Sequence, residues 1–357
     1  MNVLFWVSNS SDPSARFRFL QFVEPMRARG INVDVNILDP PRNYVFKAPG
    51  RFLKIIEGYI ILLKRIVQVL KMCEKAHKYD IIYTNKDLVP NLGILWLEFY
   101  LSKKNKNLIF DIDDAIYLGQ RGEKLNKILP YYKAVIAGSP VLSEYIYKTY
   151  GFKEFYIPMA VNTDFYKPLE KRREGKLRIG WSGSHHTNVY ALPLLEKILQ
   201  KLAEIVEFEF IVISNLNPNL NWRGVDTKFI EWTSKTEVEG LQLFDIGLMP
   251  LKDGEFEKGK CALKAVQYMA VGIPALVSPV GVNEMIIEHG INGYHCKNDE
   301  EFVKYLHILA LNDELRMQMG RNAVKSVTEK YSIDVLCERY VQVFEEVSNE
   351  NYTTMIK

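Results

Sequence analysis

Two lysines and a glutamine recur along an apolar segment in the second half of the chain. Within residues 260–272, Lys260, Lys264 and Gln267 are spaced i, i+4 and i+7, which a helix brings onto one face. The other residues there are almost all apolar, and an apolar helix is normally buried, where lysine needs an anionic partner. The stripe spans about 10 Å, roughly a diphosphate joined to a sugar. The pattern predicts a diphosphate site; the alternative is a buried helix whose lysines extend to the surface.

A second polar segment follows the strand predicted at residues 177–181. Gly183, Ser184 and His185 lie between that strand and a helix predicted over residues 190–205. Small residues at such a point let the main chain approach a phosphate, and a helix N-terminus offers N–H donors. A turn that only caps the helix would have the same composition. The His185-His186 pair is poor evidence for a metal, because adjacent side chains do not share a helix face.

The first half of the chain has two polar segments of the same kind. Ser14 and Arg16 begin the helix after the first strand, and a cation there opposes the helix dipole, so an anionic partner is expected. Asp113 and Asp114, with Asp111, follow the strand at residues 108–110 and are expected to point toward a ligand cleft. They could orient an acceptor hydroxyl, act as a base or bind a divalent ion. The structural alternatives are a solvated first turn and a turn capped by aspartate.

These residues are placed by alternating strands and helices, which predicts parallel sheets with helices on both faces. Strands are predicted at residues 3–7, 33–38, 80–83, 108–110, 134–137, 155–157, 177–181, 209–213, 227–231, 246–249 and 275–278. Helices are predicted at residues 15–29, 51–77, 88–101, 141–150, 190–205, 236–243, 260–272 and 313–347. The fold class is therefore α/β, with two doubly wound, Rossmann-like domains that face a central cleft, the expected ligand site.

The domain limits follow from a charged, apolar-poor stretch in the middle of the chain. We expect an N-terminal Rossmann-like domain at residues 1–166, a linker at 167–176 and a C-terminal Rossmann-like domain at 177–332. A C-terminal helix at residues 333–357 is expected to cross back to the first domain.

Composition excludes several classes of protein. The net charge of +3 on 357 residues argues against a nucleic-acid binder, and the four cysteines are too far apart for a zinc site or a disulfide framework. No signal peptide or membrane span is visible, so a cytoplasmic protein is expected. Residues 51–78 form a basic amphipathic pattern, which either contacts the inner face of an anionic membrane or packs on the core with its lysines solvated.

Several segments resemble the GT-B glycosyltransferases, in particular the large family 4 of retaining nucleotide-sugar transferases. The resemblance covers nearly the whole chain, and its motifs are specific together although each is weak alone. The matching segments are residues 155–168 (FYIPMAVNTDFYKP), 245–250 (DIGLMP), 267–275 (QYMAVGIPA), 283–293 (NEMIIEHGING), 319–323 (MGRNA) and 329–332 (EKYS).

The resemblance implies a nucleotide-diphospho-sugar donor held mainly by the second domain. The family's two glutamates, separated by seven residues, fall here on Gly259 and Gln267, so both are altered. Gln267 would bind the ribose, Glu284 belongs to the donor-binding segment, and Trp232 would flank the base. The phosphate role passes to Lys260 and Lys264, helped by the N–H groups of Gly183 and Ser184. Asp111-Ile-Asp-Asp114 replaces the usual histidine of the first domain.

Asp111-Ile-Asp113 also spells the D-x-D that binds a metal in the other large glycosyltransferase fold. That fold has no second doubly wound domain, so we reject this interpretation. GT-B enzymes resemble one another in using cations and helix dipoles instead, and we expect no metal and no cofactor.

The predicted function is retaining transfer of a sugar from a nucleotide-diphospho-sugar to a saccharide or lipid-linked acceptor. By resemblance, the pathway is surface polysaccharide or glycolipid assembly. Lys260 and Lys264 would stabilise the leaving diphosphate, and Asp113 or Asp114 would orient the acceptor. The alternatives are a GT-B sugar-nucleotide epimerase and a non-catalytic subunit that binds nucleotide sugars, the second suggested by the altered glutamate pair.

Overall fold

The chain folds as two separate units, each built on a six-stranded parallel sheet. The computed structural model describes residues 1–40, 45–89, 95–169, 175–349 and 352, except for the side chains of residues 120 and 121. Unit 1 consists of Met1–Pro158 and Leu336–Lys357, and unit 2 of Met159–Val335. The first segment of unit 1 thus ends at Pro158, whereas the predicted first domain ended at residue 166. Most of the predicted linker, residues 170–174, lies outside the described residues.

The sheet of unit 1 has the strand order β2-β1-β3-β4-β5-β6. Its strands are β1 (Asn2–Val7), β2 (Asn32–Ile37), β3 (Ile81–Thr84), β4 (Leu108–Ile112), β5 (Ala134–Ala137) and β6 (Phe155–Tyr156). The central strands are buried on both faces, which explains their unbroken apolar runs. Because all of the pairs are parallel, the carboxyl ends of the strands lie at one edge, where polar residues follow them.

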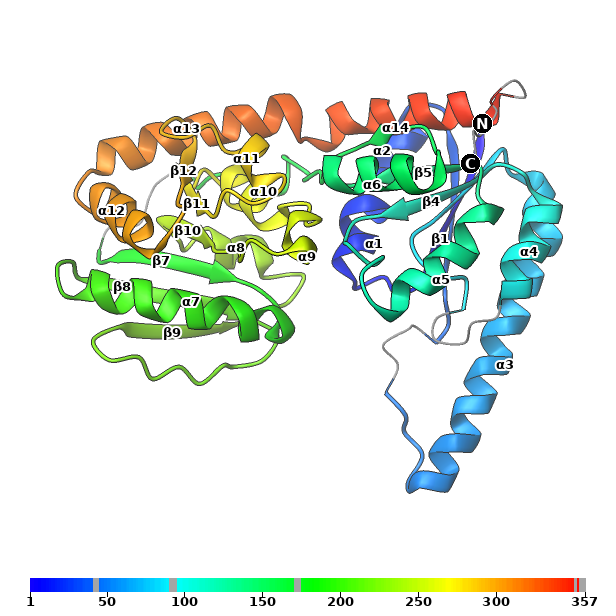
Figure 1. Ribbon diagram of the computed structural model, residues 1–357, viewed down its shortest axis with the longest axis horizontal. Helices are drawn as coiled ribbons and strands as arrows, with labels where there is room; N and C mark the ends of the chain where they lie inside the picture. Colours follow the sequence, from blue (N-terminus) through cyan, green and yellow to red (C-terminus); the bar gives the residue numbers. More distant parts are fainter. Residues whose placement is uncertain (41–44, 90–94, 170–174, 350–351, 353–357) are drawn as a thin grey trace. The chain divides into compact units, whose positions relative to one another are not determined.

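Helices cover this sheet, as Figure 1 shows. The α-helices are α1 (Pro13–Arg18), α2 (Val23–Ala28), α3 (Arg51–Lys75), α4 (Leu95–Lys104), α5 (Gln120–Ile128) and α6 (Pro140–Tyr150). Short 3-10 helices lie at η1 (Leu20–Phe22), η2 (Ala76–Lys78) and η3 (Leu129–Tyr131). Helix α6 has a well-formed start and end, since Ser139 caps its first turn, Pro140 begins it and Gly151 ends it in the left-handed region.

The last helix, α14 (Ile333–Ser348), packs on the sheet of unit 1. The ring of Phe344 lies 5.5 Å from that of Tyr83 and 6.5 Å from that of Phe5, between centroids. The ammonium group of Lys133 donates to the carbonyl oxygen of Val347 at 2.7 Å. Aromatic packing on β1 and β3 therefore holds the end of the chain to the N-terminal sheet.

The sheet of unit 2 has the order β12-β11-β10-β7-β8-β9. Its strands are β7 (Leu177–Ser182), β8 (Phe208–Ser214), β9 (Asp226–Glu231), β10 (Ile246–Met249), β11 (Ala275–Val277) and β12 (Gly293–His295). Its helices are α7 (His185–Ala203), α8 (Glu237–Leu241), α9 (Glu255–Lys258), α10 (Leu263–Ala270), α11 (Asn283–Ile286), α12 (Asp299–Ala310) and α13 (Asp313–Lys330). A core of Ile179, Phe210, Leu248 and their neighbours joins the sheet to α7 and α12.

The predicted fold class of two doubly wound, Rossmann-like parallel sheets is confirmed. Several elements differ from their predicted limits. The helix expected at residues 15–29 is divided into α1, η1 and α2, because Phe19 is not helical and Pro25 has no N–H for the carbonyl of Gln21. Helix α7 begins at His185 rather than at residue 190 and tolerates Pro193 in its interior. Helices α5, α9 and α12 and strand β12 were not predicted.

Candidate functional site

Lys264 lies over the ring of Trp181 in unit 2. Trp181 is the penultimate residue of β7, and its indole N–H donates to the side-chain oxygen of Asn188 at 2.8 Å, which fixes the ring. The Nζ atom of Lys264, in the first turn of α10, lies 5.2 Å from the ring centroid. A cation–π contact of this kind holds the ammonium group at the carboxyl end of β7.

Gly183 brings the main chain close to the same ring. A Cβ atom on Gly183 would lie 2.7 Å from the Trp181 ring and 2.7 Å from Oγ1 of Thr187, so no side chain fits. Lys264 and Gly183 therefore both lie at the ring of Trp181. One detail is corrected: the N–H of Gly183 donates to the carbonyl oxygen of Ile213 at 3.0 Å, so Gly183 contributes space rather than a donor.

The N-terminus of α7 lies beside this group. Ser184 is the N-cap, and its hydroxyl accepts from the N–H of Thr187 at 3.4 Å. The N–H of His185 donates to the side-chain oxygen of Asn215, which follows β8, at 2.7 Å. The positive end of a 19-residue helix thus lies at the end of β7, near the ammonium group of Lys264. This combination favours an anionic ligand.

Lys260 does not share a helix with Lys264, which corrects the prediction of one stripe along residues 260–272. Helix α10 begins at Leu263, and Ala262 before it adopts the left-handed conformation with φ 52°. That residue redirects the main chain, so the i, i+4 relationship is lost. The Nζ atom of Lys260 lies instead 4.5 Å from the ring centroid of Phe256 in α9. Gly281 packs against the carbonyl oxygen of Lys258 and so supports this loop.

Gln267 is buried in a polar network rather than on an open polar face. Its amide nitrogen donates to Oε1 of Glu237 and to the hydroxyl of Tyr166, both at 3.2 Å. The hydroxyl of Tyr166 donates to Oε2 of Glu237 at 2.7 Å, and the indole N–H of Trp232 donates to Oε1 at 3.1 Å. No pattern in the sequence pointed to Glu237. Its carboxylate joins α8, α10 and the segments that carry Tyr166 and Trp232.

The other predicted donor residues are exposed or partly exposed. Trp232 is partly exposed directly after β9, with its main-chain N–H donated to the carbonyl oxygen of Ser214 at 2.9 Å. Glu284 is exposed in α11, a helix of four residues. His185 is also exposed.

In unit 1 the structure separates Asp111 from the two aspartates that follow it. Asp111 is buried and forms an ion pair with Arg18, with Nε to Oδ1 at 2.7 Å, and the hydroxyl of Tyr83 also donates to it. The guanidinium group donates in turn to the carbonyl oxygen of Ile157 at 2.8 Å. Burial raises the pKa of Asp111 to about 6, although Arg18 opposes the shift. The expectation that Asp111 points toward a ligand is therefore wrong, because its carboxylate is buried in contact with Arg18 and Tyr83.

Asp113 and Asp114 remain partly exposed beyond the end of β4, where an acceptor hydroxyl could reach them. Ser14 and Arg16 are also partly exposed, in α1 beyond the end of β1. The guanidinium carbon of Arg16 lies 5.0 Å from the ring centroid of Phe17. The polar residues of unit 1 thus gather at the carboxyl edge of its sheet, as the strand pattern predicted.

Two buried polar residues at this edge, Ser8 and Asn85, are not among the predicted site residues. Ser8, Asn85 and Asp113 each directly follow their strands, and these strands (β1, β3 and β4) are neighbours in the sheet. The hydroxyl of Ser8 and both amide atoms of Asn85 make no hydrogen bond to any residue that the structure describes. Buried polar groups are normally satisfied, so these atoms are candidates to bind water or a hydroxyl group. The available signal was their position, one residue beyond an apolar strand.

Within residues 1–40, 45–89, 95–169, 175–349 and 352, no three histidine, cysteine, aspartate or glutamate side chains are grouped as a metal site would require. The four cysteines are buried and unbridged.

Part of unit 2 matches a known protein family. Residues 176–312 match the family described as Glycosyl transferases group 1. The chain is also 31% identical over 97 residues to N-acetyl-alpha-D-glucosaminyl L-malate synthase of Bacillus anthracis. That alignment covers 27% of this chain and 26% of the relative, so it spans about a quarter of each protein.

Solved structures share the fold of the whole chain. Sucrose-phosphate synthase of Thermosynechococcus elongatus has a TM-score of 0.71 at 14% identity, covering 97% of this chain and 99% of that one. A glycosyltransferase of Rickettsia africae has a TM-score of 0.69 at 15% identity, covering 98% and 99%. HepE of Anabaena, in complex with UDP-glucose, has a TM-score of 0.69 at 15% identity, covering 97% and 99%. The resemblance is confirmed at this level: residues 176–312 match the Glycosyl transferases group 1 family, and the whole chain has the fold of these structures, the GT-B fold.

Proposed function

We propose that the protein is a glycosyltransferase that moves a sugar from a nucleotide-diphospho-sugar to a saccharide or lipid-linked acceptor. The observation that carries the proposal is the meeting of Lys264, Gly183 and the N-terminus of α7 at the ring of Trp181. A cation and a helix terminus at the carboxyl end of a parallel strand suit a diphosphate. The UDP-glucose bound by HepE, a protein of the same fold, supports this choice of donor.

In the proposed reaction, the bond between the anomeric carbon and the diphosphate oxygen breaks, and the electron pair leaves with the nucleoside diphosphate. An acceptor hydroxyl forms the new bond to the anomeric carbon and gives up its proton. Lys264 stabilises the charge that develops on the leaving group, with Lys260 contributing from the preceding loop. Asp113 or Asp114 orients the acceptor and receives the proton. We propose retention of the anomeric configuration, by resemblance to the family.

We assign Trp232 to the nucleotide base and Glu284, His185 and Ser184 to the rest of the donor. Gln267 holds Glu237 and thereby positions α10, in place of the ribose contact that the resemblance implied. In unit 1, Ser8 and Asn85 join Ser14, Arg16 and the two aspartates in binding the acceptor. Assembly of a surface polysaccharide or glycolipid, inside the cell, is the proposed setting.

We propose that transfer requires no metal and no cofactor, because Lys264 and the dipole of α7 supply the positive charge. Treatment with EDTA should leave the rate unchanged. Loss of activity on chelation, restored by Mn²⁺, would favour a carboxylate-bound metal instead.

The decisive experiment incubates the protein with a panel of UDP- and GDP-sugars, with and without saccharide acceptors, and analyses the products. Stabilisation by one donor would identify it first, since ligand binding raises the unfolding temperature. A glycosylated acceptor with retained configuration supports the proposal. A changed sugar nucleotide without acceptor would indicate the epimerase alternative.

One observation favours a second candidate, a non-catalytic subunit that binds nucleotide sugars. Both family glutamates are replaced, by Gly259 and Gln267, and the side chain of Gln267 is engaged in an internal network. Tight binding of a donor without transfer or hydrolysis would support that role.

A further inference from the structure

The first half of α3 exposes its apolar side chains. Phe52 is 73% exposed, Tyr59 66% and Leu63 61%, which is unusual for large apolar residues of a folded protein. Leu53, Ile55, Ile56, Ile60 and Val67 are exposed as well. Contiguous apolar surface of this kind marks a place where another surface binds.

The exposed residues lie on one side of the helix and the packed residues on the other. Phe52, Ile56, Tyr59 and Leu63 recur at spacings of three and four, which places them on one face. The buried residues Ile61, Arg65, Val69, Met72 and Cys73 follow the same rhythm on the opposite face, and none of them lies before residue 61. Figure 1 shows the N-terminal half of α3 extending beyond the sheet of unit 1. The membrane contact predicted for residues 51–78 is thus limited to the N-terminal part of α3.

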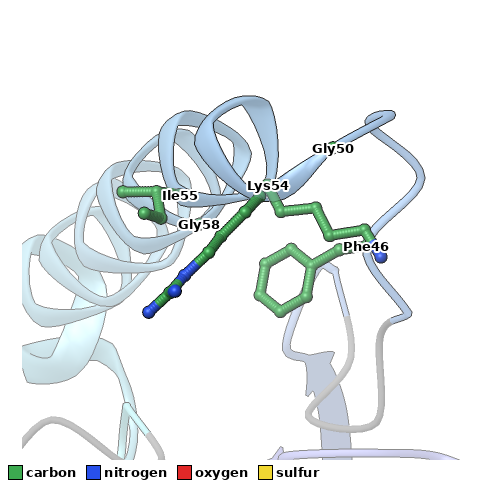
Figure 2. Close-up of a pocket in the computed structure, with 6 residues that line it drawn as sticks. Phe46, Gly50, Lys54, Ile55 and Gly58 are labelled. Carbon is green, nitrogen blue, oxygen red and sulfur yellow. The ribbon is translucent and has the colours of Figure 1, made fainter.

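Residues 46–48, which precede α3, are hydrogen-bonded to the helix and pack against it. The carboxylate of Glu57 accepts from the N–H of Lys47 at 3.1 Å and from that of Ala48 at 2.9 Å. The ring of Phe46 lies beside α3, where a Cβ atom on Gly58 would be 3.5 Å away. Figure 2 shows this ring near Lys54 at the edge of an open pocket. The pocket has a volume of about 530 Å³ and is lined by Phe46, Gly50, Arg51, Lys54, Ile55 and Gly58.

We call residues 45–64 the α3 tip. Val45, 78% exposed, and Phe46, 44% exposed, extend its apolar surface onto the segment before the helix. The tip therefore presents apolar side chains from two adjoining segments, and the hydrogen bonds of Glu57 hold those segments together.

The charge of the α3 tip is positive. Residues 45–64 contain four lysines and arginines and one carboxylate, that of Glu57, so their net charge is +3. Arg51 and Lys64 are exposed on either side of the apolar face, and Lys54 is exposed on the far side of the helix. An apolar face flanked by cations complements the acyl boundary and phosphates of an anionic bilayer. A second copy of the chain would instead meet its own positive charge.

We infer that the α3 tip docks on an anionic membrane surface, with its apolar face in the interface and its cations on the lipid phosphates. No α-helix within the described residues is long and apolar enough to cross a bilayer, so docking at the surface is the form of contact that α3 allows. This inference concerns unit 1 and does not depend on the identity of the sugar donor. If the proposed transfer is correct, the docked tip would bring the protein to a lipid-linked acceptor.

The test measures sedimentation of the full-length protein with vesicles. Vesicles of phosphatidylcholine alone are compared with vesicles that also contain phosphatidylglycerol, and binding is expected only to the second kind, decreasing with salt. Replacing Phe52 and Tyr59 by serine should weaken binding by about tenfold or more, because the interfacial apolar area is lost. The double variant Arg51→Gln, Lys64→Gln should weaken binding and reduce its dependence on salt.

Leu311→Ser is the matched control, since this residue is 72% exposed but lies in unit 2. Its binding should equal that of the wild type, and thermal unfolding should confirm that every variant is folded. Failure of the wild type to bind anionic vesicles, or equal binding by the tip variants, would overturn the inference. A concentration-dependent dimer that the tip substitutions abolish would assign the surface to self-association instead. Stabilisation by UDP-sugars, measured on the same variants, separates this result from failure of the proposed function.

Discussion

The amide nitrogen of Gln267 lies 3.2 Å from a carboxylate oxygen of Glu237, and both side chains are buried. This contact explains why a glutamine can occupy the position where the family resemblance leads one to expect a glutamate. A second carboxylate at this distance would repel the first, whereas the amide donates a hydrogen bond to it. An amide at position 267 is therefore more stable beside Glu237 of α8 than a carboxylate would be.

The first prediction follows from that contact. Gln267→Glu should lower the free energy of unfolding by about 1–3 kcal/mol at neutral pH, because it buries a second carboxylate beside Glu237 and removes a donor. Urea denaturation measures the change. The double variant Gln267→Glu, Glu237→Gln exchanges the two groups and should recover much of the loss. Equal stability of the single variant and the wild type would contradict this account.

The second prediction concerns Lys264. Lys264→Ala should reduce kcat by a factor of about 10²–10³, since it removes a cation at the developing charge, and should leave the folded state nearly intact. Lys260→Ala should have a smaller effect, because that ammonium group lies over Phe256 rather than Trp181. Lys252→Ala, at an exposed position, serves as the control. Wild-type turnover by the Lys264 variant would end the assignment of this lysine to the diphosphate.

The third prediction uses the unsatisfied amide of Asn85. Asn85→Ala removes a group that has no hydrogen bond to the described residues, so stability should be unchanged or increased. If the amide binds the acceptor, kcat/KM for the acceptor should decrease about tenfold, while the affinity for the donor stays the same. Steady-state kinetics and thermal unfolding measure the two effects. A loss of stability with no change in kcat/KM would show that Asn85 has a structural role.

The fourth prediction is a dependence of stability on pH. Glu98, buried in α4, accepts from the N–H of Leu88 at 3.1 Å, while its Oε2 atom makes no hydrogen bond within the described part of the chain. Burial raises its pKa from 4.5 to about 7. The folded state thus holds a proton that the unfolded state releases between these values, so the stabilisation is complete below pH 4.5 and is lost as the pH rises toward 7.

Over that interval the free energy of unfolding should decrease by up to about 3 kcal/mol relative to Glu98→Gln. The amide of the variant does not titrate, so denaturation curves of the two proteins at pH 5 and pH 8 isolate the effect of this carboxyl. Parallel pH dependence of the two proteins would contradict the assignment.

Much of the candidate site could be placed from the sequence, because polar residues that follow apolar strands gather at the carboxyl edge of a parallel sheet. Gly183, Ser184 and Asp113 were identified in this way, and Lys264 was identified by its apolar surroundings. The same reasoning applied to Asp111 was wrong, because its buried partner Arg18 lies 93 positions away in the chain. A carboxylate in an ion pair and a carboxylate open to a ligand have the same local sequence.

Local sequence therefore determined the order of strands and helices, and with it two parallel sheets, since periodicity and turn residues act over a few neighbouring positions. Only the tertiary structure decided which polar groups are open to a ligand and which are engaged inside. The left-handed conformation of Ala262 places Lys260 and Lys264 on different segments. The hydrogen bond to Glu237 engages the side chain of Gln267. The contacts of α3 with the rest of unit 1 show which of its faces is exposed. These outcomes depend on contacts between distant segments, which the local pattern of residues does not specify.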